Sequence, residues 1–183
     1  MLCATPSGAA TSAATPSGPG APGASAEAGE SASRGATTTT VTARIRPKRV
    51  RAGDPFTVEI VAHGATNVSS VFFHLVFDPA LVVPVPGGFA EGPWLRRDHA
   101  STRFLARPAS SGERVFVGLS RLSPGGAGGA GVACRLTFRA LAAGDTAIAF
   151  DRAGLSSPGG AEVASRFTGS TLKIRPAPAA GAP

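Results

Sequence analysis

The sequence predicts an all-β domain built from two packed antiparallel sheets, and three observations support this fold class. Short segments in which apolar and polar residues alternate recur along the chain, as in strands that bury one face. Glycine, proline, serine and aspartate separate these segments, which is the residue chemistry of tight turns. Glycine, proline or β-branched residues interrupt every window of ten residues that could otherwise form a helix. Many short strands with frequent turns are typical of a β-sandwich.

The first two predicted strands follow from simple alternation. Thr39–Arg46 alternates from Val41 onward, and Phe56–His63 alternates from Phe56 onward. The segment Arg51–Pro55 between them contains Gly53, Asp54 and Pro55, so it is expected to form the connecting turn. Each strand therefore has one face suited to a core and one suited to solvent.

The third predicted strand, Val71–Pro79, is apolar on both faces and ends at an Asp-Pro turn. One face carries Val71, Phe73, Leu75 and Phe77. The other carries Phe72, His74 and Val76. The first set is expected to hold the core. The second is either another buried layer or a surface that a partner covers.

Six further strands are predicted after the Asp-Pro turn. They are Leu81–Val85, Arg103–Ala106, Arg114–Ser120, Gly131–Ala140, Thr146–Asp151 and Arg166–Ile174. A long loop with the only tryptophan, Trp94, precedes Arg103–Ala106. The glycine-rich run Gly125–Gly131 is expected to be a mobile loop, because no helix and no Lys-Ser/Thr pair follows it to bind phosphate.

The ends of the chain differ in composition from its middle. We expect a flexible low-complexity linker over residues 1–37, the sandwich over 38–176 and a disordered tail over 177–183. Small residues and prolines dominate the linker and the tail, which lack the apolar area that would offset the entropy of ordering.

The two cysteines are expected to have separate roles. Cys134 shares the inward parity of Leu136 and Phe138, so it is predicted to be a small core residue. Cys3 precedes a flexible segment, as the lipidated cysteine of a processed bacterial lipoprotein does. Two alternatives stay open for Cys3, a lipid anchor and a free exposed thiol. Contact with a membrane is expected only through such an anchor.

Charge and motif content favour a protein without catalytic activity. The formal charge of +7 comes almost wholly from arginines that are scattered along strands. A basic cluster surrounds one turn and comprises Arg44, Arg46, Lys48, Arg49 and Arg51. It lacks interleaved exposed aromatics, so nucleic-acid binding is not expected. The three histidines have no metal-ligand spacing, so we expect no metal and no cofactor, and no Gly-x-Ser-x-Gly motif is present. A Ser-His-Asp site needs only spatial proximity, and the candidate group for one is Asp98 and His99 next to Ser101 in a loop.

The order of these motifs resembles that of cohesin modules. The segment Val50–Val58 is similar to the cohesin opening, and Val68–Val82 resembles the third strand with its Asp-Pro continuation. Arg114–Ser120 is similar to the sixth strand, and Gly129–Ala140 resembles the strand after a glycine-rich loop. Together with Ala143–Thr146 and Gly169–Ile174, the resemblance extends over essentially Thr38–Arg175.

This resemblance implies a nine-stranded antiparallel β-sandwich with jelly-roll topology from the carbohydrate-binding-module superfamily. Cohesins are non-catalytic and bind dockerins, small calcium-binding helical modules of polysaccharide-degrading enzymes and other secreted proteins. The resemblance further implies a location at the bacterial cell envelope or outside the cell. In the family, the outer face of the sheet with strands three, five, six and eight meets the partner. Carried over to this chain, that face comprises Ser70, Phe72, His74, Val76, Arg114, Phe116, Gly118 and Ser120. Arg103 and Arg107 flank strand five, where the parity stays open.

Three functions are compatible with this pattern. The first is a protein-binding module that recruits a dockerin-like partner at the envelope. The second is a carbohydrate-binding module of the same superfamily. Sugar platforms generally need exposed planar aromatics, so the single tryptophan, Trp94, and the absence of tyrosine weigh against this function. The third is a purely structural domain in which the loop of Trp94 covers Phe72, so that Phe72 is buried.

Overall fold

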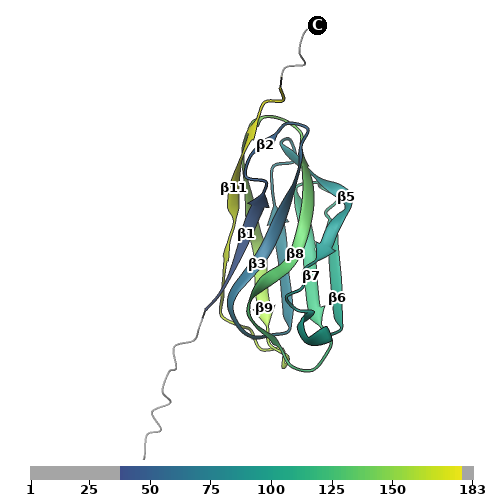
Figure 1. Cartoon of the computed structure of the whole chain (residues 1–183), viewed down its shortest axis with the longest axis vertical. Coiled ribbons are helices and arrows are strands. Elements are labelled where there is room, and N and C mark those ends of the chain that lie inside the picture. The colour runs from purple at the N-terminus through teal and green to yellow at the C-terminus, as the bar shows by residue number, and fades with distance from the viewer. Residues whose placement is uncertain (1–37, 179–183) are drawn as a thin grey trace, which may run out of the picture. The chain divides into compact units, whose positions relative to one another are not determined.

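The computed structural model describes residues 38–178, which form an all-β domain of eleven strands (Figure 1). The strands are β1 (Thr39–Arg46), β2 (Val50–Arg51), β3 (Pro55–Val68), β4 (Ser70–Val76), β5 (Val82–Glu91), β6 (Thr102–Pro108), β7 (Arg114–Arg121), β8 (Ala127–Ala140), β9 (Gly144–Ser156), β10 (Ser165–Thr168) and β11 (Ser170–Arg175). A single 3₁₀ turn, Arg97–His99, interrupts the loop between β5 and β6. The predicted linker over residues 1–37, with Cys3, lies outside the described residues.

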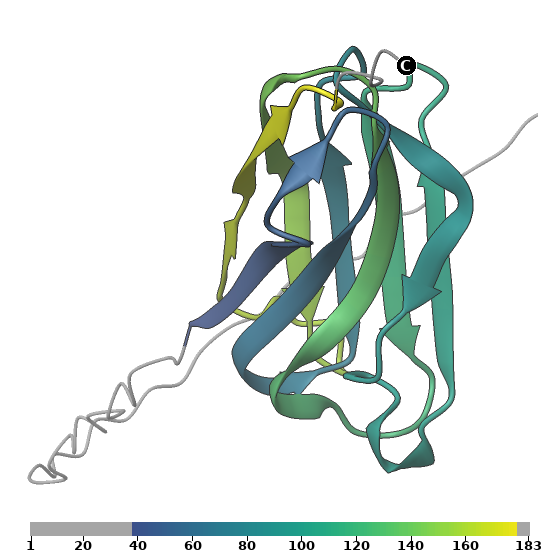
Figure 2. The same ribbon diagram turned by 45° about the horizontal axis from the view of Figure 1, so that its top comes forward.

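The strands form two sheets that pack face to face, as the two layers in Figure 2 show. The five-stranded sheet has the order β10-β1-β3-β8-β5, and the six-stranded sheet has the order β2-β11-β9-β4-β7-β6. Most pairings are antiparallel, but β1 with β10 and β11 with β2 are parallel. No helix within residues 38–178 is long and apolar enough to span a membrane.

The prediction of nine strands is wrong by two: the last predicted strand forms two strands, and one short strand lies between the first two predicted strands. The predicted strand Arg166–Ile174 is divided at Gly169 into β10 and β11, which pair with β1 in one sheet and β9 in the other. An added Cβ at Gly169 would overlap the carbonyl oxygen of Ile148, so glycine permits the crossing. The other extra strand is β2, which consists of two residues beside the end of β11.

The core between the sheets contains the side chains that strand alternation predicts. Phe73, Leu75 and Phe77 of the third predicted strand are buried, and so is Cys134 on β8. The ring of Phe138 lies 5.1 Å from the Phe77 ring, measured between centroids, in an edge-to-face contact. Burial raises the pKa of the Cys134 thiol far above its ordinary value, so this cysteine behaves as a small apolar core residue.

Most of the glycine-rich run is not a loop, because residues from Ala127 onward belong to β8 and pair with β3, while Gly125 and Gly126 precede this strand. Trp94 explains the glycine at position 131, within β8. Its indole is fully buried, and its Nε1 donates a hydrogen bond to the carbonyl oxygen of Gly128 at 3.3 Å. An added Cβ at Gly131 would lie 2.9 Å from Cδ1 of Trp94. The strand therefore requires a glycine at this position so that the indole can pack against the backbone.

Candidate protein-binding face

The eight residues predicted for partner binding lie together on the outer surface of the six-stranded sheet. We call this surface the β4/β7 face. Across the two strands the register pairs Ser70 with Ser120, Phe72 with Gly118, His74 with Phe116 and Val76 with Arg114. The residues between them, such as Phe73 and Val117, point into the core. Alternation therefore assigned the two sides of β4 and β7 correctly, whereas the binding role stays a prediction.

Two neighbouring strands extend this face, and one supplies an apolar residue that sequence reasoning missed. On β6, the register places Arg103 beside Ser120, Leu105 beside Gly118 and Arg107 beside Phe116. This settles the parity that the sequence left open, because both arginines share the outer side with Leu105. On the opposite flank, β9 pairs with β4 along its other edge.

An exposed apolar strip crosses the centre of the β4/β7 face. Phe72 is 50% exposed and Leu105 is 61% exposed. Gly118 lies between them in the register, and an added Cβ there would meet no atom within 4 Å. The Phe72 ring leans the other way, over β9, because an added Cβ at Gly154 would lie 2.6 Å from its Cε1 atom. The strip therefore has a gap at Gly118 between two large apolar side chains.

A row of polar and aromatic side chains in contact with one another lies beside this strip. His74 contacts Phe116 edge to face, with ring centroids 4.5 Å apart. The Arg107 guanidinium carbon lies 5.8 Å from the centroid of the same phenylalanine ring, in a cation–π arrangement. The Nδ1 atom of His74 is buried without a hydrogen-bond partner among the described residues. This row is more polar than the strip and borders it on one side.

The charge around the face is mainly positive. Arg114 pairs with Asp151 at 3.5 Å and with Glu113 at 3.2 Å, so its charge is largely balanced. Within residues 38–178, no acidic side chain lies at ion-pair distance from Arg103 or Arg107. A hollow of about 660 Å³ lined by Arg107, Glu113 and other residues adjoins Phe116. The face thus combines an apolar centre with a basic border, which fits the general pattern of an apolar interface core with a polar rim.

The structure bears on two of the alternative functions through the exposure of Trp94 and Phe72. Trp94 is fully buried, so it does not supply the exposed planar aromatic that a sugar-binding platform would need. The exposure of Phe72 contradicts the structural hypothesis, in which the loop of Trp94 covers this residue. In the part of the chain that the structure describes, no group of three or more His, Cys, Asp or Glu side chains could hold a metal ion.

No protein-family model matches the sequence, and no curated protein matches it either. Comparison with solved structures gives consistent similarities at low sequence identity. A type II cohesin domain from the cellulosome of Acetivibrio cellulolyticus superposes with a TM-score of 0.62 at 15% identity, over 75% of this chain and 95% of that chain. A non-cellulosomal cohesin from the archaeon Archaeoglobus fulgidus gives a TM-score of 0.59 at 18% identity, over 75% of this chain and 91% of that chain.

A third similar structure is the type I cohesin–dockerin complex from Clostridium thermocellum. It gives a TM-score of 0.62 at 12% identity, over 76% of this chain and 95% of that chain. These similarities cover most of each cohesin module, and they agree with the sheet arrangement described above. The domain over residues 38–178 therefore has the fold of a cohesin module.

Proposed function

We propose that this protein is a non-catalytic binding module that recruits a dockerin-like partner through the β4/β7 face. The observation that carries the proposal is the exposed pair Phe72 and Leu105 at the centre of an otherwise ordered sheet surface. Large apolar side chains on a flat face, with arginines at the border, form the kind of cluster that dominates binding energy in interfaces. Similar folds occur in complexes described as cohesin–dockerin complexes, which supports this choice of partner class.

The location and linkage follow from the same proposal. A dockerin-like partner is a small calcium-binding helical module, so we place the interaction at the cell envelope or outside the cell. We connect this protein with polysaccharide-degrading assemblies only because dockerins are borne by polysaccharide-degrading enzymes. A lipid anchor at Cys3 would tether the module and stays part of the proposal.

Affinity capture on the immobilised full chain tests this function. Secreted and envelope proteins are passed over the wild type and the Phe72→Glu variant, with calcium or with EDTA. We expect the wild type to retain, only with calcium, a protein that carries duplicated Asp/Asn-rich calcium loops. The Phe72→Glu variant should lose it. Leu141→Glu is the matched control, because Leu141 is 49% exposed and lies outside the face.

The gap at Gly118 provides a second test, in which a substitution adds a methyl group and removes no existing side-chain contact. Ala at this mid-strand position meets no neighbour, so Gly118→Ala should leave the free energy of unfolding unchanged or raise it by about 0.4–1 kcal/mol. The same methyl group stands in the gap between Phe72 and Leu105, so affinity for the captured partner should fall at least tenfold. Unchanged affinity in both Phe72→Glu and Gly118→Ala would contradict binding through this face.

A further inference from the structure

The lateral opening of the sandwich between β1 and β11 is a second candidate site, distinct from the β4/β7 face. The first half of β1, Thr39–Thr42, pairs with β10 on one edge, but no described strand continues this pairing beside Ala43–Arg46. On β11, β2 pairs only with Ile174 and Arg175, so no described strand lies along that edge of Ser170–Lys173. Two strand edges, each four residues long, therefore face each other across the opening.

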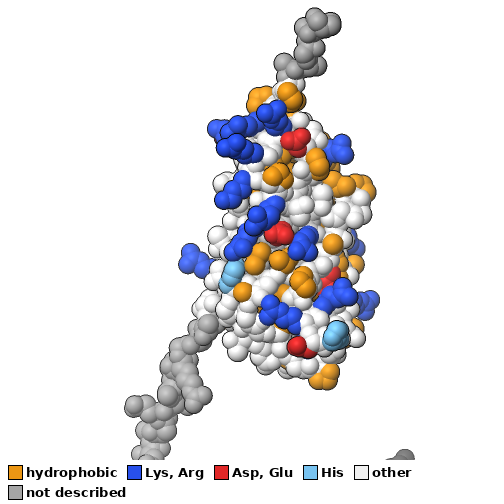
Figure 3. All heavy atoms as spheres, viewed as in Figure 1, with side chains coloured by type: hydrophobic (Ala, Val, Ile, Leu, Met, Phe, Trp, Pro, Cys, Tyr) orange, Lys and Arg blue, Asp and Glu red, His pale blue; other side chains and the backbone are white. Residues whose placement is uncertain are grey.

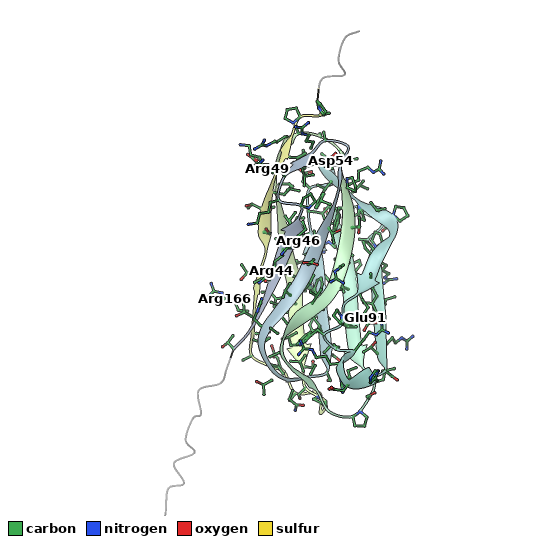
Figure 4. All side chains as sticks on the ribbon, viewed as in Figure 1. Arg44, Arg46, Arg49, Asp54, Glu91 and Arg166 are labelled. Carbon is green, nitrogen blue, oxygen red and sulfur yellow. The ribbon has the colours of Figure 1, made fainter. Side chains whose placement is uncertain are left out.

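These two edges enclose a cleft of about 570 Å³, with an apolar floor and a basic rim. Ala43 and Leu172 form the buried part of its lining, and Ile45 is partly exposed. Arg44, Lys48 and Lys173 are exposed side chains along it. Figure 3 shows lysine and arginine side chains gathered over this side of the domain, and Figure 4 places Arg44 and Arg46 along β1.

Among the described residues, negative charge beside this rim is limited to Glu59, which binds Arg46, and Asp145, which lies opposite Lys173 in the register without forming an ion pair with it. Glu59 accepts hydrogen bonds from Arg135 at 3.0 Å and from Arg46 at 3.3 Å, and these bonds lower the pKa of its carboxyl group below the ordinary 4.5. Glu59 is therefore shared between two arginines. Within residues 38–178, Lys48 and Lys173 have no acidic side chain at ion-pair distance.

The opposite lateral opening, between β5 and β6, shows how this sandwich protects a strand edge elsewhere. There β5 contains Pro84 and Pro86, its register with β8 shifts after Pro84, and β6 ends at Pro108. Proline cannot donate a ladder hydrogen bond, so that side is a poor template for an added strand. The edges Ala43–Arg46 and Ser170–Lys173 contain no proline and keep every backbone N–H.

We propose that the cleft between β1 and β11 binds an extended acidic peptide segment, which pairs with the free edge of β1. Four residues of edge correspond to about 13 Å of extended chain. Side chains of an added strand would alternate between the apolar floor and the basic rim, so the fitting segment alternates aliphatic and acidic residues. The like charges of the rim disfavour a second copy of this chain, whereas carboxylates complement them.

Fluorescence anisotropy with the full chain tests the proposal. The probe is a fluorescein-labelled eight-residue peptide of alternating glutamate and valine. We expect saturable binding that falls at least tenfold in the variant with Arg44→Glu and Lys173→Glu. The control variant, with Arg96→Glu and Arg139→Glu, has the same net charge but changes exposed arginines outside the cleft, and its affinity should stay within threefold of wild type.

Two modified peptides separate strand pairing from simple charge attraction. In one, every valine is N-methylated, and in the other every glutamate is, so each lacks the N–H groups along one edge. We expect at least one of them to bind at least tenfold more weakly than the parent peptide. No saturable binding, equal loss in both protein variants, equal binding of all three peptides, or displacement by polygalacturonate at matched carboxylate concentration would overturn the proposal. The Phe72→Glu variant should bind the peptide normally, so this test is independent of the β4/β7 face.

Discussion

Phe72 and Phe73 are adjacent in sequence but lie on opposite faces of β4, and their alanine variants should differ sharply in stability. Phe73 is 1% exposed, and its ring contacts that of Phe150 edge to face with centroids 5.3 Å apart. Replacing it removes buried contacts and leaves a cavity between the sheets. Changes of this kind cost about 3–5 kcal/mol of unfolding free energy.

The cost of Phe72→Ala should be much smaller. Burying a complete phenylalanine side chain is worth about 1.5–3 kcal/mol, and Phe72 is 50% exposed, so about half of that value is at stake. The vacated space opens to solvent, so no cavity term is added. We therefore expect Phe72→Ala to lower the free energy of unfolding by about 0.8–1.5 kcal/mol, with the fold retained.

Urea unfolding followed by the fluorescence of Trp94 measures both values. Trp94 is the only tryptophan and is fully buried, so unfolding exposes a single reporter. The midpoint should shift strongly in Phe73→Ala and weakly in Phe72→Ala, with similar slopes. A loss of more than about 3 kcal/mol in Phe72→Ala would refute the assignment of this residue to the outer face.

Three further measurements test other parts of the structure. Gly131→Ala should destabilise the domain, because the added methyl group would overlap the buried Trp94 indole, and the urea midpoint reports this loss. Glu59 has a lowered pKa in the folded state, so its contribution to stability is present above the ordinary value of 4.5 and is lost as pH falls through the folded value. A Glu59→Gln variant should thus lose stability near neutral pH and show a weaker decline on acidification; an unchanged pH profile would contradict this contribution. In a Cys3→Ser background, Cys134 should resist a thiol reagent in the folded protein and react in denaturant, whereas rapid labelling of the folded protein would show that this cysteine is accessible.

Most of the fold could be predicted from strand alternation, but the crossing of the last predicted strand between the two sheets could not. The two faces of β4 could be assigned because a period of two fixes which side chains share a face. The crossing at Gly169 was not predictable, because Arg166–Ile174 reads as one continuous strand and the exchange between sheets depends on a close backbone approach. Leu105 was missed for a different reason. Its segment places Phe104, Leu105 and Ala106 in succession, so alternation did not decide which of them points outward.

The glycines in this chain show a similar limit. A glycine-rich run is typical of a loop, and only the structure reveals that Gly131 makes room for Trp94 within a strand. Gly118 and Gly154 lie on either side of Phe72 in the register, and both are paired within continuous strands. The sequence signal for each is a glycine within an otherwise regular strand, which indicates a close approach but not what approaches.

The two proposed sites differ in the kind of partner that each can recognise. Phe72 lies on β4, a strand paired on both edges, so its backbone is already satisfied and a partner can reach only side chains. A helix presents side chains without free backbone groups, so it suits the β4/β7 face. The cleft beside Ala43–Arg46 offers the opposite, an unpaired backbone edge with few protruding apolar side chains, which suits an extended segment. Helical and extended partners should therefore bind without competing, and a helical partner displaced by the glutamate–valine peptide would contradict this division.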